Sequence, residues 1–381
     1  MKQSRRRFLR DSARIGLGAA VGPALIGCVS GSGVKGPSPV ALNLTAGPGS
    51  LKAHAAEHGF LCGCAVNTRL LGSDEGYAGL IRGQANIVVA ENAMKWSALR
   101  PAIDSYKFDE ADALVAFAEK NGMKVRGHNL CWHRQLPKWF DAQATTANAR
   151  GLLTAHIEQV AGRYAGRMHS WDVVNEAVLV SDGRADGLRD SPWLRLVGED
   201  YIEQAFQTAR SVDPLALLTY NDYGIEREDE ASEKKRTAVL VLLRRLKARR
   251  VPLDAVGIQS HITAGHTYGA GLTAFMAAAR GLGLQIFLTE MDVNDRELPA
   301  DEVVRDVAVA GAYGSYLDMA LRDPAVRVVI TWGITDRSTW LNGEDARADH
   351  VPERCLPFDR DDKPKKAFFA MRDSFDKRTL G

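Results

Sequence analysis

The sequence predicts an α/β fold, a single (β/α)₈ barrel of the TIM type that follows a signal peptide and a short linker. Short runs of β-forming residues alternate with longer segments of helical period, which is the pattern of parallel βαβ units. Eight such units are present, and eight close naturally into a barrel. An open doubly wound sheet is the alternative, but no GxGxxG pattern follows the first predicted strand.

The eight predicted strands are short and β-rich. In chain order they cover Leu61–Val66, Ile87–Ala90, Lys124–Asn129, Met168–Val174, Ala216–Tyr220, Ala255–Ser260, Gln285–Thr289 and Val326–Thr331. No internal repeat of fixed length accompanies the alternation of strands and helices.

The segments between the strands carry apolar residues at helical spacing. Phe108–Asn121 is one example, with apolar residues at positions 111, 114, 115 and 118 and a stop signal at Asn121-Gly122. Ala149–Tyr164 and Glu199–Ser211 have the same pattern. Glu230–Arg249 is expected to turn Leu240, Leu243 and Leu246 inward and a basic face, which includes Lys234, Lys235 and Arg236, toward the solvent.

The composition excludes several classes of protein. The chain has 381 residues, of which 45% are hydrophobic and 25% charged, and its formal net charge is +2. These are ordinary values for a globular protein. No stretch reaches about 18 uninterrupted apolar residues, which excludes a bundle of membrane helices. Residues 1–27 carry six basic side chains and one acidic one, so the remaining 354 residues sum to −3. A mildly acidic mature chain argues against a nucleic-acid partner.

The N-terminus is typical of an export signal. Residues 1–27 are basic, then weakly apolar, then small, so we interpret them as a signal peptide. The run SRRRFL (4–9) resembles the twin-arginine motif. The run LIGC (25–28) resembles a bacterial lipobox, which predicts a lipid on Cys28; an ordinary free thiol is the alternative. Residues 28–45 are predicted to be a flexible linker and residues 46–381 the barrel domain. The protein is therefore expected in the periplasm, on the outer membrane or at the cell surface.

Four further cysteines follow, namely Cys62, Cys64, Cys131 and Cys355. An exported protein could pair them. Cys62 and Cys64 would share one strand face, however, too far apart to bridge easily. No CxxC spacing is present, so we expect mostly free, buried thiols and no metal site.

The chemistry of such a barrel lies at the C-terminal ends of its strands. Seven of the eight predicted strands bring carboxylates, amides, imidazoles or indoles to that rim. Packing alone does not explain this concentration, because buried polar groups cost free energy unless they are paired. The rim residues are Glu91, Asn92, Lys95, His128, Trp132, Gln135, Asn175, Glu176, Asn221, Tyr223, Gln259, His261, Glu290, Asp292, Trp332 and Trp340.

Two of the rim carboxylates stand out. Glu176 follows the fourth predicted strand and Glu290 follows the seventh. Strands four and seven lie on opposite sides of an eight-stranded barrel, so these carboxylates are expected to face each other across its mouth. Two opposed carboxylates that flank a bond are what glycoside hydrolysis needs. One is protonated and donates to the leaving oxygen, and the other is ionised and acts as nucleophile or as a base for water.

The aromatic residues of the rim also suit a sugar. Trp132, Trp332 and Trp340 offer flat surfaces to the apolar faces of sugar rings. The neighbouring amide, imidazole and ammonium groups can bond hydroxyls. Trp139, Trp171 and Trp193 are instead expected in the core.

At these residues the sequence resembles the family-10 glycoside hydrolases, which are mainly endo-β-1,4-xylanases. The matching stretches run in the family's order from about residue 50 to the C-terminus, and together they are highly specific. They are ENAMKW (91–96), GHNLCWHRQLPKW (127–139), WDVVNEA (171–177), YNDY (220–223), GIQSHI (257–262), LTEMDV (288–293), TWGITDRSTW (331–340), LPFD (356–359) and KPKKAF (363–368). Gly224 departs from the family, which often has Asn at that position.

The resemblance implies a retaining endo-β-1,4-xylanase that cleaves internal bonds of xylan by double displacement. It implies Glu176 as the general acid/base, Glu290 as the nucleophile and Asn175 as the partner of the sugar 2-hydroxyl. His261, oriented by Asp292, would hold Glu290. Glycone subsites would be lined by Glu91, Asn92, Lys95, His128, Trp132, Gln135, Gln259, Trp332 and Trp340, and the aglycone side by Asn221 and Tyr223. Xylan and xylo-oligosaccharides would be the ligands of a monomer that needs no cofactor and no metal, and that meets a membrane only through a lipid on Cys28.

Three other functions stay open. Another retaining β-glucanase or cellulase on the same barrel would share the Asn-Glu and later Glu pattern, although Lys95, His128 and the GIQSH segment favour the xylanase family. A non-catalytic sugar-binding surface protein would have no need of the filled catalytic positions. A metal-dependent hydrolase would need clustered ligands, and His128 and His133 form no HxH or HExxH pattern.

Overall fold

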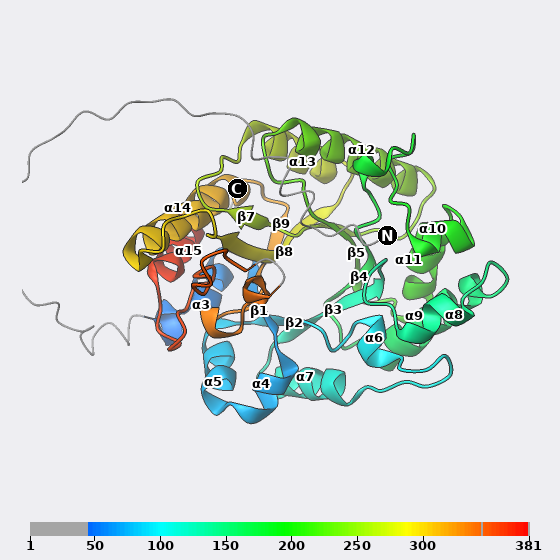
Figure 1. Cartoon of the computed structure of the whole chain (residues 1–381), viewed down its shortest axis with the longest axis horizontal. Helices are drawn as coiled ribbons and strands as arrows, with labels where there is room; N and C mark the ends of the chain where they lie inside the picture. Colours follow the sequence, from blue (N-terminus) through cyan, green and yellow to red (C-terminus); the bar gives the residue numbers. More distant parts are fainter. Residues whose placement is uncertain (1–44, 344–345, 380–381) are drawn as a thin grey trace, which may run out of the picture.

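The computed structural model describes residues 45–343 and 346–379. Within these ranges eight parallel strands form a ring and helices surround it (Figure 1). The strand order is β6-β5-β4-β3-β2-β1-β9-β8, and the pairing of β6 with β8 closes the ring. The predicted (β/α)₈ barrel is thereby confirmed. The predicted signal peptide, Cys28 and the linker up to residue 44 lie outside the described residues.

The barrel strands are almost entirely buried, because their side chains face either the lumen or the surrounding helices. They are β1 (Leu61–Val66), β2 (Ile87–Ala90), β3 (Lys124–Cys131), β4 (Ser170–Asn175), β5 (Leu217–Asp222), β6 (Ala255–Ile258), β8 (Gln285–Asn294) and β9 (Val326–Thr331). One short strand was not predicted. This is β7 (His261–Thr263), which pairs with residues 292–294 of β8, beyond the barrel itself.

A polar side chain caps the start of the helices α4, α5, α10, α12 and α14. Asp229 accepts a hydrogen bond from the amide of Ser232 at α12, and Asp301 accepts one from Val304 at α14. The α-helices are α3 (Leu51–Glu57), α4 (Thr68–Ser73), α5 (Glu75–Gln84), α6 (Trp96–Leu99), α7 (Asp109–Lys120), α8 (Lys138–Gln143), α9 (Ala149–Arg163), α10 (Pro192–Val197), α11 (Tyr201–Val212), α12 (Glu230–Ala248), α13 (Ala270–Gly281), α14 (Glu302–Ala320) and α15 (Lys366–Asp376). Short 3₁₀ turns are η1 (Gly47–Gly49), η2 (Val180–Asp182), η3 (Asp336–Ser338) and η4 (Trp340–Asn342).

Three apolar clusters of described residues form the core, and the smallest contains Leu341, Cys355 and Leu356. The largest one joins the strands to the helices and includes Trp139, Trp171 and Trp193, as predicted. A smaller one combines residues of β1, β2, β6, β8 and β9, Phe287 among them, with Trp332, which follows β9. Cys62, Cys64, Cys131 and Cys355 are free and buried, which confirms that prediction. No helix in the described part of the chain is long and apolar enough to cross a membrane.

The basic run on α12 differs from the expected solvated face. Lys235 and Arg236 are buried, because each reaches a partner outside its own helix. The Lys235 ammonium lies 2.8 Å from Oδ1 of Asp222, and Arg236 donates to the carbonyl of Ile225 over 2.8 Å. Leu240, which was expected to point inward, is half-buried. The prediction was wrong here because helical periodicity carries no information about partners on neighbouring loops.

Candidate active site

Two buried glutamates lie at the C-terminal ends of barrel strands β4 and β8, which are separated in the ring by β5 and β6. Glu176 follows β4 directly, and Glu290 lies within β8, where the register against β9 shifts between Leu288 and Met291. Their exposed fractions are 2% and 4%. Glu176 has a left-handed backbone with φ of 58°. Its amide donates to the carbonyl of Asn221 over 2.8 Å and its carbonyl accepts from Nε of Arg189 over 2.7 Å, so the backbone of Glu176 is fixed from two sides.

Two buried amides connect these glutamates. Nδ2 of Asn221 donates to Oε1 of Glu290 over 2.8 Å and lies 2.8 Å from the side-chain amide oxygen of Asn175. Nε2 of Gln259 donates to Oε1 of Glu176 over 3.0 Å and lies 3.5 Å from the same Asn175 oxygen. The resemblance implied sugar contacts for Asn221 and Gln259. In the structure both side chains are fully buried and donate hydrogen bonds to Glu290 and Glu176, so they hold the two carboxylates in place.

Asn221 is itself fixed by β6 and β8. Oγ1 of Thr289 donates to Oδ1 of Asn221 over 2.7 Å, which orients the amide so that its nitrogen faces Glu290. Gly257 on β6 leaves the space that the amide fills, since a Cβ atom there would lie 2.2 Å from Oδ1 of Asn221. The glycine in the GIQSHI stretch is therefore a packing requirement of the site.

His261 and Asp292 support the other face of Glu290. Nε2 of His261 lies 3.1 Å from Oε2 of Glu290, and Nδ1 lies 2.9 Å from Oδ1 of Asp292. Nε1 of Trp340 donates to the second oxygen of Asp292 over 2.7 Å. Burial alone would lower the pKa of His261, but the charges and hydrogen bonds of Asp292 and Glu290 raise it to about 10. The imidazole is therefore protonated at neutral pH.

Glu290 is kept ionised by these neighbours. Burial raises its pKa, but the hydrogen bond from His261 and the positive charges of His128 and His261 outweigh that effect. The charge of Glu176 acts in the opposite direction. The net result is a pKa of Glu290 below its ordinary value, which suits an anionic group at neutral pH.

His128 belongs to a polar column inside the barrel. Its Nδ1 lies 2.9 Å from Oδ2 of Asp172, and Asp172 forms a buried ion pair with Arg126. The guanidinium of Arg126 lies 5.4 Å from the ring centre of Phe287 in the lumen. The His128 imidazole is thus held in place by side chains of β3 and β4.

Lys95 and two tryptophans form one flank of the site. The Lys95 ammonium lies 5.3 Å from the ring centre of Trp132 and 5.8 Å from that of Trp332, and it donates to Oδ1 of Asn92 over 3.0 Å. Burial raises the pKa of Glu91, although Lys95 lowers it in part. Glu91 and Asn92 also line a cavity of about 400 Å³. Gln135 is exposed, and its carbonyl accepts from the amide of Ser97 over 2.9 Å.

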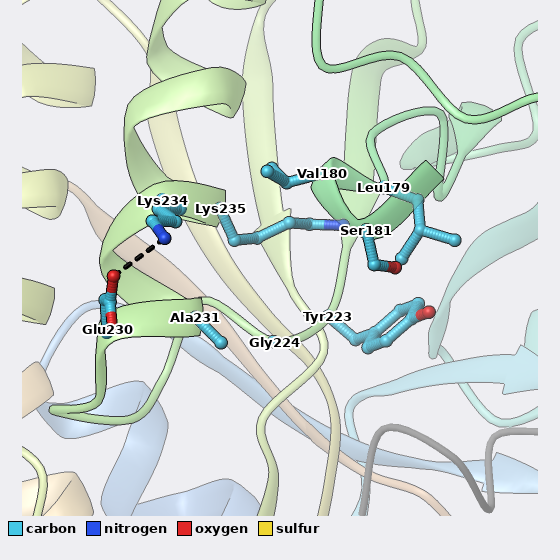
Figure 2. A pocket seen from close by; sticks show the side chains of 9 residues that line it. All are labelled: Leu179, Val180, Ser181, Tyr223, Gly224, Glu230, Ala231, Lys234 and Lys235. Atoms are coloured by element: carbon cyan, nitrogen blue, oxygen red, sulfur yellow. Dashed lines mark ion pairs between the residues drawn. The ribbon is translucent and has the colours of Figure 1, made fainter. Parts of the chain in front are cut away.

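Tyr223 lies on the opposite flank, beside a pocket of about 340 Å³ (Figure 2). Its hydroxyl accepts from Nη2 of Arg189 over 3.0 Å. The ammonium of Lys235 lies 4.8 Å from its ring centre. Val180 and Gly224 contribute the apolar part of the wall. Of the two residues implied for the aglycone side, Tyr223 therefore lines an open space, whereas Asn221 lies between the glutamates.

Comparison with known proteins assigns the chain to a family. The sequence profile described as "Glycosyl hydrolase family 10" matches residues 50–374. The chain belongs to glycosyl hydrolase family 10. It is 36% identical to a "Beta-1,4-xylanase" of Dictyoglomus thermophilum over 77% of this chain and 83% of that protein. It is 34% identical to "Endo-1,4-beta-xylanase B" of Thermotoga neapolitana over 93% of this chain and 96% of that protein. The crystal structure of xylanase 10B from Thermotoga petrophila in complex with xylobiose aligns with a TM-score of 0.78 and 34% identity over 86% of this chain and 97% of that one.

Some residues of this family-10 site were not predicted from the sequence. Nδ1 of His133 lies 3.9 Å from Oε2 of Glu176, and Arg189 holds the Glu176 backbone from the loop before α10. His133 stands inside the GHNLCWHRQLPKW stretch, directly after Trp132, which was a usable signal. No local sequence pattern predicts the role of Arg189, because its partner Glu176 lies 13 residues away across an irregular loop. Among residues 45–343 and 346–379, no group of three or more His, Cys, Asp or Glu side chains could hold a metal ion.

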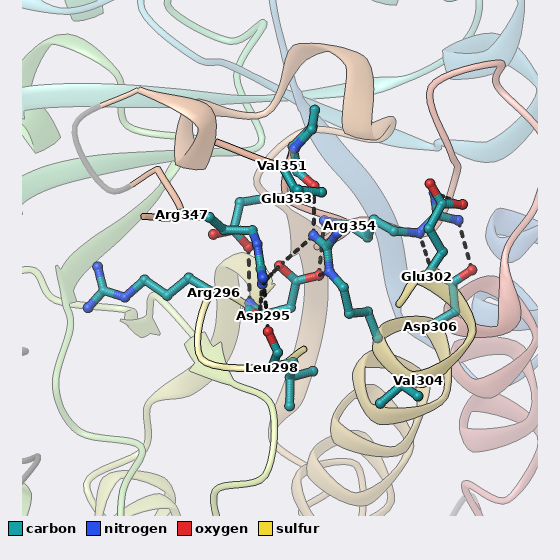
Figure 3. A network of polar contacts seen from close by, with 12 residues as sticks. Asp295, Arg296, Leu298, Glu302, Val304, Asp306, Arg347, Val351, Glu353 and Arg354 are labelled. Carbon is teal, nitrogen blue, oxygen red and sulfur yellow. Dashed lines mark hydrogen bonds and ion pairs between the residues drawn. The ribbon is translucent and has the colours of Figure 1, made fainter. Parts of the chain in front are cut away.

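A buried ionic network fastens the segment that follows Trp340 to the end of β8 (Figure 3). Asp295 forms a two-point ion pair with Arg305, and its backbone carbonyl accepts from Nη1 of Arg347 over 2.7 Å. The amide of Asp295 donates to Oε2 of Glu353 over 3.1 Å. Burial and the neighbouring Asp295 raise the pKa of Glu353 to about 9. The network thereby joins residues 347–353 to the end of the strand that carries Glu290.

Proposed function

We propose that this family-10 glycoside hydrolase is a retaining endo-β-1,4-xylanase that acts on xylan and xylo-oligosaccharides. The names of the compared relatives support the substrate. One observation carries the mechanism, namely the unequal surroundings of two buried glutamates. Glu290 is held ionised by the His261 imidazole 3.1 Å away and by His128, whereas Glu176 receives a hydrogen bond from the neutral amide of Gln259 and has Nδ1 of His133 only at 3.9 Å. Such a difference in surroundings suits one carboxylate as nucleophile and the other as proton donor.

In the first step Glu290 would attack the anomeric carbon while the bond from that carbon to the leaving oxygen breaks. Glu176 would give its proton to the leaving oxygen, and a covalent glycosyl–enzyme would form. In the second step Glu176 would accept a proton from water as the water attacks the anomeric carbon. The bond to Glu290 would then break and restore both carboxyl groups.

The flanks of the site would place the sugars. Trp132, Trp332 and Trp340 would contact ring faces, and Asn175 would bond the 2-hydroxyl of the sugar being cleaved. Hydroxyls of the glycone sugars would bond Glu91, Asn92, Lys95, His128 and Gln135, and Tyr223 would contact the aglycone. Asn221 and Gln259 would act on the substrate through the glutamates that they hold.

Release of reducing sugar from xylan, measured beside carboxymethylcellulose, tests the substrate. We expect release from xylan that is unaffected by a chelator. Comparable release from carboxymethylcellulose would favour a β-glucanase or cellulase. A protein that binds xylan without releasing sugar would be a sugar-binding surface protein, and loss of activity with the chelator would favour a metal-dependent hydrolase.

We also propose that the protein is a monomer exported by the twin-arginine route and anchored by a lipid on Cys28. The basic start, the small-residue apolar segment and the LIGC run support the export route and the lipid anchor. Mass spectrometry of the mature N-terminus tests it, with a diacylglyceryl-cysteine expected as the first residue. Cys28→Ala should leave the protein in the soluble periplasmic fraction, and a membrane-bound Cys28→Ala protein would contradict the anchor.

A further inference from the structure

Ser260 lies between two residues whose side chains bond different glutamates of the site. Gln259, before it, donates to Glu176, and His261, after it, bonds Glu290. β6 ends at Ile258 and β7 begins at His261, so the chain changes strand within these positions. Ser260 has a left-handed backbone with φ of 62°. The direction of both neighbouring side chains therefore depends on this one kink.

The kink is held by two side chains from other parts of the barrel. Oε1 of Glu226, from the loop between β5 and α12, accepts from the amide of Ser260 over 2.9 Å. The hydroxyl of Tyr316 on α14 lies 2.8 Å from Oγ of Ser260, which also donates to the carbonyl of Ile258 over 3.0 Å. Glu226 is 3% exposed and Tyr316 is fully buried. Neither residue has a role in the mechanism proposed above.

A left-handed backbone is unfavourable for a residue that carries a Cβ atom, so it persists only where the surroundings fix it. A buried carboxyl group is costly as well, unless it is hydrogen-bonded. Burial raises the pKa of Glu226, and the Ser260 amide together with His261 and Arg227 lowers it in part. The phenols of Tyr268 and Tyr316 also face this carboxyl group. The hydrogen bond from the Ser260 amide to Glu226 therefore stabilises both the left-handed backbone and the buried carboxyl group.

We infer that Glu226 is a positioning residue for both proposed catalytic glutamates. By accepting the Ser260 amide it fixes the kink that directs Gln259 to Glu176 and His261 to Glu290. Glu226 acts through these two residues and does not itself touch the substrate. The inference rests on the roles proposed for Glu176 and Glu290.

Two conservative variants of Glu226 distinguish the effect of side-chain length from the effect of side-chain charge. Glu226→Gln keeps the length of the side chain and an acceptor oxygen but removes the charge. Glu226→Asp keeps the charge but is one methylene too short for the Ser260 amide. We expect Glu226→Gln to retain most of kcat on xylan, and Glu226→Asp to lose roughly tenfold to a hundredfold in kcat with little change in KM. The acidic limb of kcat/KM should move to higher pH in Glu226→Asp. A displaced His261 lowers the pKa of Glu290 less, while the effects of Glu176, which raises that pKa, and of His128, which lowers it, stay the same.

Glu228 provides a matched control from the same loop. Its carboxylate accepts from the amides of Gly269, Gly271 and Leu272, at the start of α13. Glu228→Ala should lower the thermal midpoint and leave kcat, KM and the pH profile unchanged. If Glu226→Asp does not fold, Tyr316→Phe removes the second support of Ser260 and should lower kcat at constant KM.

The outcomes distinguish this inference from the proposed function. A wild-type protein without xylanase activity would overturn the proposed function. An active wild type with an unaffected Glu226→Asp would overturn the positioning role alone. So would a Glu226→Gln variant as impaired as Glu226→Asp, because charge rather than reach would then matter.

Discussion

The imidazole of His261 contacts the carboxylate of Glu290, with 3.1 Å between Nε2 and Oε2. The contact joins a protonated histidine to an ionised glutamate, because Asp292 supports the histidine from behind. An anionic carboxylate is thereby maintained inside a buried site by hydrogen bonds and charges of neighbouring side chains. The pH dependence of activity and of stability follows from this pair.

His261→Gln should move the acidic limb of kcat/KM to higher pH. The variant loses a positive charge and a charge-assisted hydrogen bond to Glu290, so the pKa of Glu290 rises and a smaller fraction is ionised in mild acid. The pH profile of kcat/KM on xylo-oligosaccharides measures the shift. His54→Gln, which changes a histidine paired with Asp376 on α15, should leave the limb in place. An unshifted limb in His261→Gln would remove His261 from the control of Glu290.

The same pair predicts how stability depends on alkaline pH. The pKa of His261 is about 10 in the folded protein, above the value of about 6.5 expected when the chain is unfolded. The stabilisation from this group is therefore fully present below about pH 6.5 and is lost as the pH rises toward about 10. The difference in free energy of unfolding between wild type and His261→Gln, measured by denaturant titration, should shrink over that range. A constant difference would show that the histidine is neutral in the folded state.

Much of the fold was predictable because periodicity is a local property. The predicted spans of β1, β2 and β9 coincide with the observed ones, and the helices at α7, α9, α11 and α12 differ from prediction by one or two residues at their ends. The end of β8 was missed by five residues. Its ladder continues through Glu290 to Asn294 because β7 provides a partner there, and a strand of three residues leaves almost no pattern in the sequence.

The sequence allowed most residues of the site to be predicted, but not the hydrogen bonds that these residues make with one another. The strand-end rule collected Glu176, Glu290, His261 and Asp292 correctly at one rim. The resemblance implied sugar contacts for Asn221 and Gln259, and their bonds to Glu290 and Glu176 were not predicted. Whether an amide faces a ligand or a carboxylate depends on distant residues, such as the glycine on β6 that makes room for Asn221.

Lys235 illustrates the same limit and gives a test of stability. Its ammonium is paired with the fully buried Asp222, so Lys235→Met should leave that carboxylate unpaired and cost about 3–5 kcal/mol in free energy of unfolding. Lys234→Met, next in the chain, breaks only an exposed pair with Glu230 and should cost less than about 1 kcal/mol. Urea unfolding of both variants measures the contrast. Equal costs would mean that the Lys235–Asp222 pair contributes no more than a surface ion pair.

Gly257→Ala tests the space that Asn221 occupies. The new Cβ atom would lie 2.2 Å from Oδ1 of Asn221 and 3.0 Å from Cγ2 of Thr289, so the amide must leave the position from which it bonds Glu290. We expect kcat on xylan to fall by roughly a hundredfold, since small displacements at a reacting group have effects of that size. Gly281→Ala at the end of α13 meets no atom within 4 Å and should leave kcat unchanged. Normal activity in Gly257→Ala would contradict the role assigned to Asn221.

The anomeric configuration of the first product, followed by ¹H NMR during hydrolysis of a xylo-oligosaccharide, tests the central claim most directly. If Glu290 forms a covalent glycosyl–enzyme and Glu176 then activates water on the same face, the β-anomer must appear first and mutarotate to α afterwards. Initial release of the α-anomer would mean that water attacks directly from the opposite face, and the division of roles between Glu176 and Glu290 would be wrong.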